Sequence, residues 1–361
     1  MEYFKVMEDK GLIVMEGVKG GHDGMSASEP KRFRKKKQVP LNIPSLASEV
    51  RAGCRTSLSK AITLIESSNA EHKEQAQMLL QDLLPYTGNS IRVGITGVPG
   101  AGKSSFIEAF GNMLCSLGKK VAVLAIDPSS SLSGGSILGD KTRMETLIRQ
   151  ENAFIRPSPS AGTLGGVHKK TRETMLLCEA AGFDVILIET VGVGQSETFV
   201  RGMVDFFLLL VLTGAGDELQ GMKKGIMELA DAILVHKADG DNLRIARKTV
   251  REYQQILHFL QPATPGWTST SLMASSLEKT GLEEVWTMLL EFEKTVKASK
   301  YWESRRNDQT REWFHSMIRD HLIDAFYSDT NRKTEVRSLE EDILKGRITV
   351  TQGVNQLFPV D

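Results

Sequence analysis

The residues best suited to chemistry lie in a glycine-rich stretch near residue 100. Residues 97–104 fit G-x-x-x-x-G-K-[ST], a pattern whose glycines let backbone N–H groups surround a phosphate oxygen. Lys103 adds a full positive charge, and the Ser104 hydroxyl can bind Mg²⁺. The stretch therefore predicts a nucleoside triphosphate bound with Mg²⁺, held by Gly97, Val98, Pro99, Gly100, Ala101, Gly102, Lys103, Ser104 and Ser105.

Carboxylates lie where predicted strands end, which is where ligands of a parallel sheet bind. Asp127 directly follows the predicted strand 121–126, and Glu189 lies near the end of the strand 185–190. Asp140 follows a Ser/Gly-rich stretch that is either a phosphate-sensing loop or a flexible linker. Its side chain could reach the metal or cap a helix instead. The predicted metal ligands are Ser104, Asp127, Asp140 and Glu189.

Two further loops carry candidate catalytic groups. Many GTPases have Asp-x-x-Gly after a buried strand, and this chain has Glu189 with Gly192 three residues later. The Gly192 N–H would then lie near the γ-phosphate. In the glycine-rich loop after the strand 206–213, Gln220 and Lys223 approach the nucleotide or a partner, or form a solvated helix start. The catalytic candidates are Lys103, Gly192, Gln220 and Lys223.

A fourth loop indicates which base is bound. Guanine-specific proteins usually have Asn-Lys-x-Asp after a strand, because the Asp accepts hydrogen bonds that adenine cannot donate. This chain has Lys237 and Asp239, with His236 at the Asn position. The pattern predicts guanine preference with altered affinity. Further base-contacting residues are expected after the next strand, at Ser275, Ser276 and Leu277.

The elements that position these loops alternate from residue 91 to about 290. Most strand candidates are continuous apolar runs, which indicates burial on both faces in a mostly parallel, doubly wound α/β sheet. The fold class predicted is a P-loop NTPase with a helical N-terminal extension and a helical C-terminal arm. The strand candidates are 91–96, 121–126, 153–156, 185–190, 206–213, 232–236 and 270–274.

Along the whole chain, the sequence predicts four regions. They are a flexible basic arm at 1–40, a helical extension at 41–88, the P-loop domain at 89–294 and a helical arm at 295–361. An amphipathic surface helix pair is expected within 45–84. Core packing is the favoured role for two apolar stripes in the C-terminal helices, and packing on a second subunit is the alternative. The stripes are Leu282, Val285, Trp286, Leu289, Leu290 and Phe292, and Trp302, Trp313, Phe314, Ile318, Leu322 and Phe326.

Composition limits the partners. The 361 residues carry 45 Lys and Arg against 45 Asp and Glu, so no global field attracts nucleic acid or a membrane. The basic run at 31–37 has two interpretations: a solvated flexible segment, or a segment that binds an anionic partner. Three cysteines in no metal-ligand spacing indicate a reducing compartment. Acidic residues near the start argue against a transit peptide, so a cytoplasmic protein is expected, with the mitochondrial matrix as the alternative.

Taken together, the motifs resemble the methylmalonyl-CoA mutase-associated GTPase family. The likeness covers roughly residues 45–295, and members were once described as arginine/ornithine transport-system kinases. It implies GTP hydrolysis by a homodimer that gates adenosylcobalamin loading and protects an adenosylcobalamin-dependent acyl-CoA mutase. His236 departs from the family pattern, and the run at 31–37 is not explained by it. The stretches that carry the likeness are 97–104, 124–131, 139–144, 189–197 and 216–221.

The resemblance also implies roles for the loops. Segments 127–143 and 189–201 would be two switches, and 212–223 a third switch that faces the mutase. The tail after about 295 would be the dimerisation arm. By position, Mg²⁺ would be surrounded by Ser104, Asp127, Asp140 and Glu189.

Two other functions remain open from the residues alone. A P-loop small-molecule kinase would phosphorylate a metabolite rather than water. A metallocentre-assembly GTPase would need a Cys/His cluster, and none is visible in the sequence. No residue stands out as the group that positions the attacking water, so slow intrinsic hydrolysis is expected, with a partner supplying what is missing.

Overall fold

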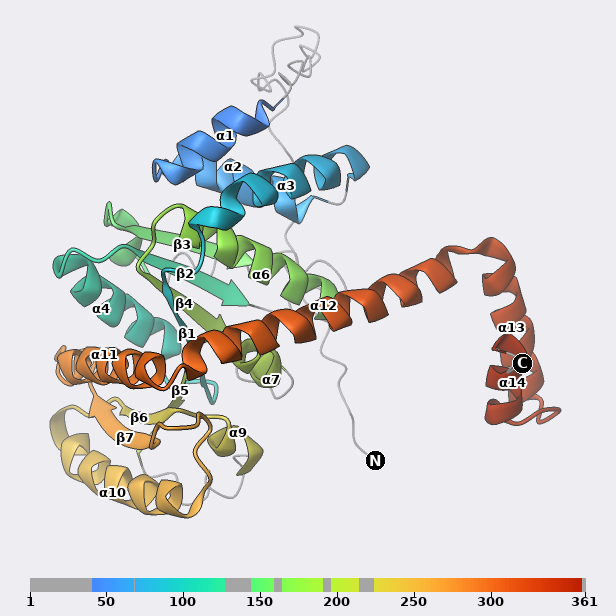
Figure 1. Ribbon diagram of the computed structural model, residues 1–361. Coiled ribbons are helices and arrows are strands. Elements are labelled where there is room, and N and C mark those ends of the chain that lie inside the picture. Colours follow the sequence, from blue (N-terminus) through green and yellow to red (C-terminus); the bar gives the residue numbers. More distant parts are fainter. Residues whose placement is uncertain are drawn as a thin grey trace, which may run out of the picture. The chain divides into compact units, whose positions relative to one another are not determined.

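One parallel sheet organises the chain. The computed structural model describes residues 41–67, 69–126, 144–158, 164–190, 196–213 and 224–358. Within them, seven strands pair in the order β3-β2-β4-β1-β5-β6-β7 (Figure 1). All pairs are parallel. The strands are β1 (Ile91–Gly97), β2 (Val121–Ile126), β3 (Ala153–Ser158), β4 (Val185–Thr190), β5 (Phe206–Val211), β6 (Ala232–His236) and β7 (Thr270–Ala274).

The strand order places β1 at the centre of the sheet. Val93 pairs with Leu187 of β4 on one side and with Phe206 of β5 on the other. Strands β2, β4, β5 and β6 are buried along their whole length, as their continuous apolar runs predict. The predicted fold class, a doubly wound P-loop NTPase sheet, is confirmed. The carboxyl end of β1 therefore lies between those of β4 and β5.

Helices cover both faces of the sheet. One face packs on α4 (Lys103–Ser116) and α11 (Leu282–Ala298) through a core that includes Val93, Phe106 and Phe292. The other face packs on α6, α7, α9 and α10, through two apolar clusters (Figure 1). These helices are α6 (Leu164–Ala180), α7 (Ser196–Arg201), α9 (Lys224–Glu228) and α10 (Leu243–Phe259).

The N-terminal extension consists of three helices rather than the expected pair. They are α1 (Ile43–Arg51), α2 (Arg55–Glu66) and α3 (Ala70–Leu83). Side chains of Asn42 and Asn69 accept hydrogen bonds from backbone N–H groups at the starts of α1 and α3. These caps satisfy N–H groups that a continuous helix would use internally, so helix starts form at these points. The three helices pack against α6, and their apolar side chains join its core.

Four helices form the C-terminal part: α11, α12 (Tyr301–Ser328), α13 (Thr330–Leu344) and α14 (Val350–Leu357). The predicted stripe of α11 is buried at four of its six positions, while Trp286 is half-buried and Leu290 is exposed. Helix α13 packs on both α12 and α14, and the ring of Phe358 stacks on Phe326.

The core-packing prediction for the second apolar stripe is wrong for most of its length. Trp302 is buried against the body, but Phe314 and Leu322 are each 62% exposed, and Ile318 is exposed as well. The reason is length: 28 residues of helix extend about 42 Å, and the buried residues of α12 all lie within its first three turns. Beyond those turns, α12 presents apolar side chains that no described part of this chain covers.

Candidate functional site

The phosphate loop connects the central strand to α4. Gly97 ends β1 with φ 151°, and a Cβ at this position would lie 2.3 Å from the Leu210 carbonyl oxygen of β5. Only glycine allows the backbone to pass so close to the neighbouring strand. Residues 97–105, all predicted to bind nucleotide, therefore form one turn from strand to helix at the middle of the sheet edge.

Lys103 is folded into this loop. Its Nζ donates to the carbonyl oxygens of Gly97 (2.8 Å) and Val98 (3.3 Å), and the residue is only 9% exposed. Burial lowers the pKa of Lys103, and the charges of Glu189 and Glu197 partly offset that effect. Burial deprives the Lys103 ammonium of water, so an anion bound beside it would stabilise its charge strongly. The arrangement suits a phosphate group at this position.

Two of the four predicted metal ligands lie together. The Ser104 hydroxyl donates to Oε1 of Glu189 at 2.8 Å, and Glu189 is buried at the carboxyl end of β4. A hydroxyl and a carboxylate are hard oxygen donors of the kind that Mg²⁺ prefers, so this pair fits the predicted ion. Asp127 and Asp140 lie outside the described residues. The described residues hold no group of three or more His, Cys, Asp or Glu side chains placed to bind a metal.

The predicted base-contacting residues meet at the ends of β6 and β7. Oδ2 of Asp239 accepts a hydrogen bond from the Ser275 hydroxyl at 2.6 Å. The Ser275 hydroxyl also accepts from the backbone N–H of Glu278, so the turn after β7 holds the carboxylate in place. Lys237 and Leu277 are exposed beside it. Lys237 and Asp239, which the sequence pattern predicts to recognise guanine, therefore lie just past the carboxyl end of β6.

His236, the last residue of β6, is bonded to protein through both ring nitrogens. Nδ1 lies 2.7 Å from the carbonyl oxygen of Ala101 in the phosphate loop. Nε2 lies 2.7 Å from the hydroxyl of Ser276. The imidazole thus connects the phosphate loop to the turn that follows β7.

Further contacts at the carboxyl ends of the strands were not predicted from the sequence. The Thr190 hydroxyl donates to Thr96 at 2.9 Å, which joins the ends of β4 and β1. Asn242 donates to the Lys237 carbonyl and accepts from Thr213, which joins the loops after β6 and β5. Each threonine lies at or just past a strand end, and that position is the one signal that could have identified it.

Three of the four catalytic candidates cannot be placed. Lys103 lies in the phosphate loop, but Gly192, Gln220 and Lys223 lie outside the described residues. The same holds for the segment 127–143 and for the basic run at 31–37.

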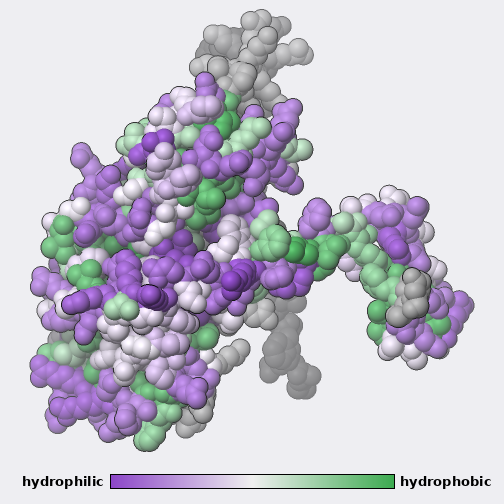
Figure 2. All heavy atoms as spheres, viewed as in Figure 1, coloured by the Kyte–Doolittle hydropathy of each residue, from purple (hydrophilic) through white to green (hydrophobic). Residues whose placement is uncertain are grey.

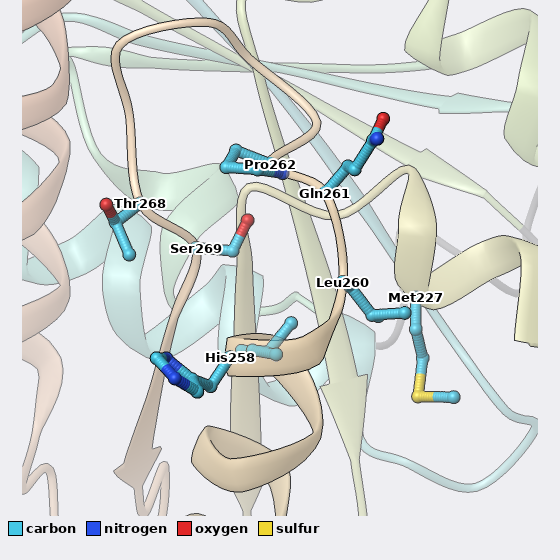
Figure 3. A pocket seen from close by; sticks show the side chains of 8 residues that line it. Met227, His258, Leu260, Gln261, Pro262, Thr268 and Ser269 are labelled. Carbon is cyan, nitrogen blue, oxygen red and sulfur yellow. The ribbon is translucent and has the colours of Figure 1, made fainter.

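Two cavities elsewhere are separate from this edge. One of about 160 Å³ is lined by Met227, His258 and Ser269, at the amino end of β7 and hence opposite the phosphate loop (Figure 3). The other, of about 240 Å³, lies between α6, α7 and α12 and is lined by Arg172, Phe199 and Trp313. Neither contains a predicted site residue. No helix among the described residues has the length and apolar character to span a membrane.

Comparisons with known proteins agree with this geometry. The family model described as "Methylmalonyl Co-A mutase-associated GTPase MeaB" matches residues 58–331. A Caulobacter vibrioides protein named as a GTPase is 53% identical over 88% of this chain and 97% of its own. The mitochondrial methylmalonic aciduria type A homolog of Mus musculus is 40% identical over 96% of this chain and 84% of its own.

A solved structure is similar over most of the chain. The crystal structure titled as an LAO/AO transport system kinase has a TM-score of 0.72 and 38% identity, covering 87% of this chain and 96% of that one. The similarity therefore extends through the sheet and the helices on both of its faces.

Proposed function

This chain belongs to the methylmalonyl-CoA mutase-associated GTPase family and hydrolyses GTP, and on that premise we propose that it is a chaperone of an adenosylcobalamin-dependent acyl-CoA mutase. In this role it gates the loading of adenosylcobalamin and protects the mutase from inactivation. The observation that carries the proposal is the family match across residues 58–331, which includes every described loop of the nucleotide site.

The proposed chemistry is in-line attack of water on the γ-phosphorus of GTP. Lys103 and backbone N–H groups of the loop 97–105, in which Pro99 has none, stabilise the charge that develops on the phosphate. Ser104, Asp127, Asp140 and Glu189 are the proposed ligands of Mg²⁺, which when bound neutralises charge on the phosphates. Gly192 is proposed to donate its N–H to the γ-phosphate. The hydrogen bond between Ser104 and Glu189 supports the proposed Mg²⁺ site, because it shows two oxygen ligands of the kind that Mg²⁺ prefers side by side at the phosphate loop.

The proposed switches are the loops that follow strands at this edge. Segments 127–143 and 212–223 follow β2 and β5, and segment 189–201 begins at the end of β4 and includes α7. Gln220 and Lys223 of the third segment are proposed to face the mutase. The mutase must bind the GTP and GDP forms with different affinity, since a nucleotide otherwise could not act as a switch.

We further propose that the chain acts as a homodimer through residues 295–361. The exposed apolar side chains of α12 support this proposal, because a monomer in water gains nothing from presenting them (Figure 2).

The experiment is a GTPase assay with and without a purified adenosylcobalamin-dependent acyl-CoA mutase, with adenosylcobalamin loading followed in parallel. Addition of the mutase should raise the hydrolysis rate, and nucleotide should control loading. A Lys103→Ala protein is the control, and we expect it to lose at least about 100-fold in hydrolysis. If the mutase changes neither rate nor loading, the chaperone role is wrong while the GTPase activity stands.

The kinase alternative is separated by the same assay. Phosphate released from GTP should equal GDP formed. A shortfall matched by a phosphorylated metabolite would indicate phosphoryl transfer to a small molecule instead.

A further inference from the structure

His236 is the residue at which this chain departs from the usual guanine-binding pattern, and its surroundings define a role for it. The ring is 2% exposed and lies against the phosphate loop. A Cβ added to Gly102 would lie 2.6 Å from Nδ1 and 2.7 Å from Cε1 of the imidazole. The Phe106 ring of α4 meets it edge-on, with centroids 6.0 Å apart. The imidazole is therefore held between the phosphate loop and α4 by contacts that leave little room for reorientation.

The bonding partners assign the position of the proton. The Ala101 carbonyl oxygen can only accept a hydrogen bond, so Nδ1 of His236 must carry the hydrogen. Nε2 then holds a lone pair and accepts from the Ser276 hydroxyl. Burial lowers the pKa of His236, which favours this neutral form. Both nitrogens are thus used by protein partners, and the ring cannot bond to a base without losing one of them.

The contacts form a continuous link across the site. His236 connects Ala101 of the phosphate loop to Ser276 in the turn after β7. The adjacent Ser275 bonds to Asp239, the proposed guanine acceptor. The part of the loop that would surround phosphate and the carboxylate that would bind the base are therefore tied together through one neutral side chain.

We infer that His236 is a positioning residue: a neutral strut that sets the distance between the phosphate loop and the base-binding turn, and thereby the affinity for guanine nucleotides, without contacting the nucleotide. The inference rests on the proposed nucleotide site, in which Asp239 accepts from guanine. A nucleotide that spans both loops binds tightly only when their spacing is already correct, because otherwise binding must supply the reorganisation.

Four substitutions separate the two bonds of the strut. In His236→Asn the amide nitrogen takes the place of Nδ1 and keeps the bond to Ala101. In His236→Gln the terminal amide reaches the place of Nε2 and keeps the bond to Ser276. His236→Ala removes both bonds, and Ser276→Ala removes one without changing the buried ring. Ser269→Ala is the matched control, because its hydroxyl bonds to the Ala230 carbonyl at the opposite edge of the sheet.

The measurements are the Kd for GDP, and KM and kcat for GTP. We expect Ser276→Ala to raise Kd and KM about three- to tenfold, the range for one lost hydrogen bond, and His236→Ala, which removes both bonds, to raise them at least as much, with kcat nearly unchanged in each. His236→Asn and His236→Gln should fall between His236→Ala and the parent protein. Ser269→Ala should match the parent. The His236→Ala and Ser276→Ala effects should be less than additive in the double variant, because both break the same link.

Three outcomes would overturn the strut. If Ser276→Ala binds GDP like the parent while His236→Ala does not, the imidazole acts on the nucleotide directly. If kcat falls while KM stays constant, His236 serves the chemical step. Equal GDP affinity in all folded variants would leave the ring no role in binding. An Asp239→Asn protein tests the premise separately: if its guanine affinity is unchanged, the proposed base site itself is wrong.

Discussion

At the scale of single residues, the neutral state of His236 makes stability depend on pH. Burial lowers the pKa of His236, with Lys237 acting in the same direction, while the bond to Ala101 and the charge of Asp239 oppose the shift. Three ionisable residues lie within two positions of the residues that contact the ring: Lys103 and Glu108 of α4, and Glu278 of the turn after β7. A histidine with a lowered folded pKa binds its proton more readily in the unfolded chain.

The sign of the effect follows directly. The stabilisation is complete above the unfolded pKa of about 6.5 and is lost as the pH falls from there towards the lower folded value. We predict that the free energy of unfolding of the parent protein falls more steeply below pH 6.5 than that of His236→Asn. The difference in slope has a ceiling of about 1.4 kcal/mol per pH unit. Denaturant titrations at several pH values measure it, and identical slopes would contradict a neutral buried imidazole.

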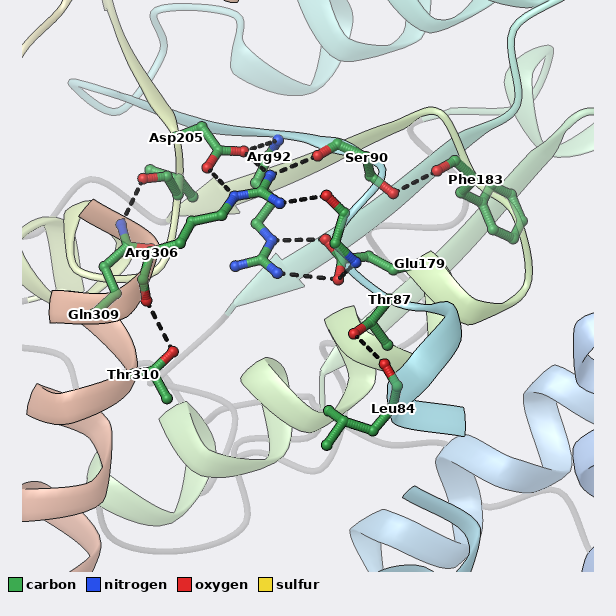
Figure 4. A network of polar contacts seen from close by, with 12 residues as sticks. Leu84, Thr87, Ser90, Arg92, Glu179, Phe183, Asp205, Arg306, Gln309 and Thr310 are labelled. Carbon is green, nitrogen blue, oxygen red and sulfur yellow. Dashed lines mark hydrogen bonds and ion pairs between the residues drawn. The ribbon is translucent and has the colours of Figure 1, made fainter. Parts of the chain in front are cut away.

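At the scale of elements, the start of α12 is bound to the sheet by a buried polar network. Arg306 donates to both carboxylate oxygens of Asp205 and to the carbonyls of Gly88 and Ser90 (Figure 4). In the same network, Arg92 of β1 forms an ion pair with Glu179 of α6 (Figure 4). The first turns of α12 are therefore fixed to the amino ends of β1 and β5.

Arg172 extends this attachment towards the proposed second switch. Its guanidinium donates to the Gln309 carbonyl of α12 and to the Gly202 carbonyl just after α7. Burial lowers the pKa of Arg172 to about 10, although the Glu312 charge opposes the shift. The side chain stays charged at neutral pH and connects α6, α7 and α12. A movement of α7 should therefore change the position or the stability of the first turns of α12.

We predict that Arg172→Met uncouples these helices. In the parent protein, exchanging GDP for a non-hydrolysable GTP analogue should change hydrogen exchange in the first turns of α12. In Arg172→Met that difference should shrink, and the free energy of unfolding should fall by about 2 kcal/mol because two carbonyls lose a charged donor. Arg311→Met is the control, because its ion pair with Asp308 is exposed and contributes little. An unchanged exchange difference in Arg172→Met would argue against transmission through this contact.

At the scale of the whole molecule, the exposed apolar face of α12 is the surface through which we propose that two copies of the chain associate. Phe314, Ile318 and Leu322 follow one another at intervals of four residues and are exposed. Figure 2 shows hydrophobic residues gathered along this helix. Side chains at this spacing share one face of a helix, so they present a continuous surface to a partner.

We predict that Leu322→Asp weakens the proposed homodimer by at least about 50-fold, since it removes an apolar contact and buries a charge. Sedimentation equilibrium measures the change. Thr287→Asp adds the same charge on the exposed side of α11 and should leave assembly unaffected. A Leu322→Asp protein that associates like the parent would place any dimer contact elsewhere.

Much of the fold followed from local patterns. The strands 121–126, 185–190, 232–236 and 270–274 were predicted at their observed bounds. For the first three the reason is that a strand buried on both faces is a largely continuous apolar run. The helices were less accessible to sequence reasoning. The apolar stripe of α12 has the same spacing whether it faces a core or solvent, so periodicity alone favoured burial, and the structure exposes most of it.

By itself, the sequence determined the phosphate loop, since one short stretch contains both the glycines for the turn and the lysine for the charge. Only the tertiary structure decided which residues His236 contacts. Its partners lie 135 and 40 residues away along the chain, and Ser104 meets Glu189 across 85 residues. Contacts at such separations depend on which strands become neighbours in the sheet. Strand order is set by the packing of the whole chain, and no local pattern of residues encodes it.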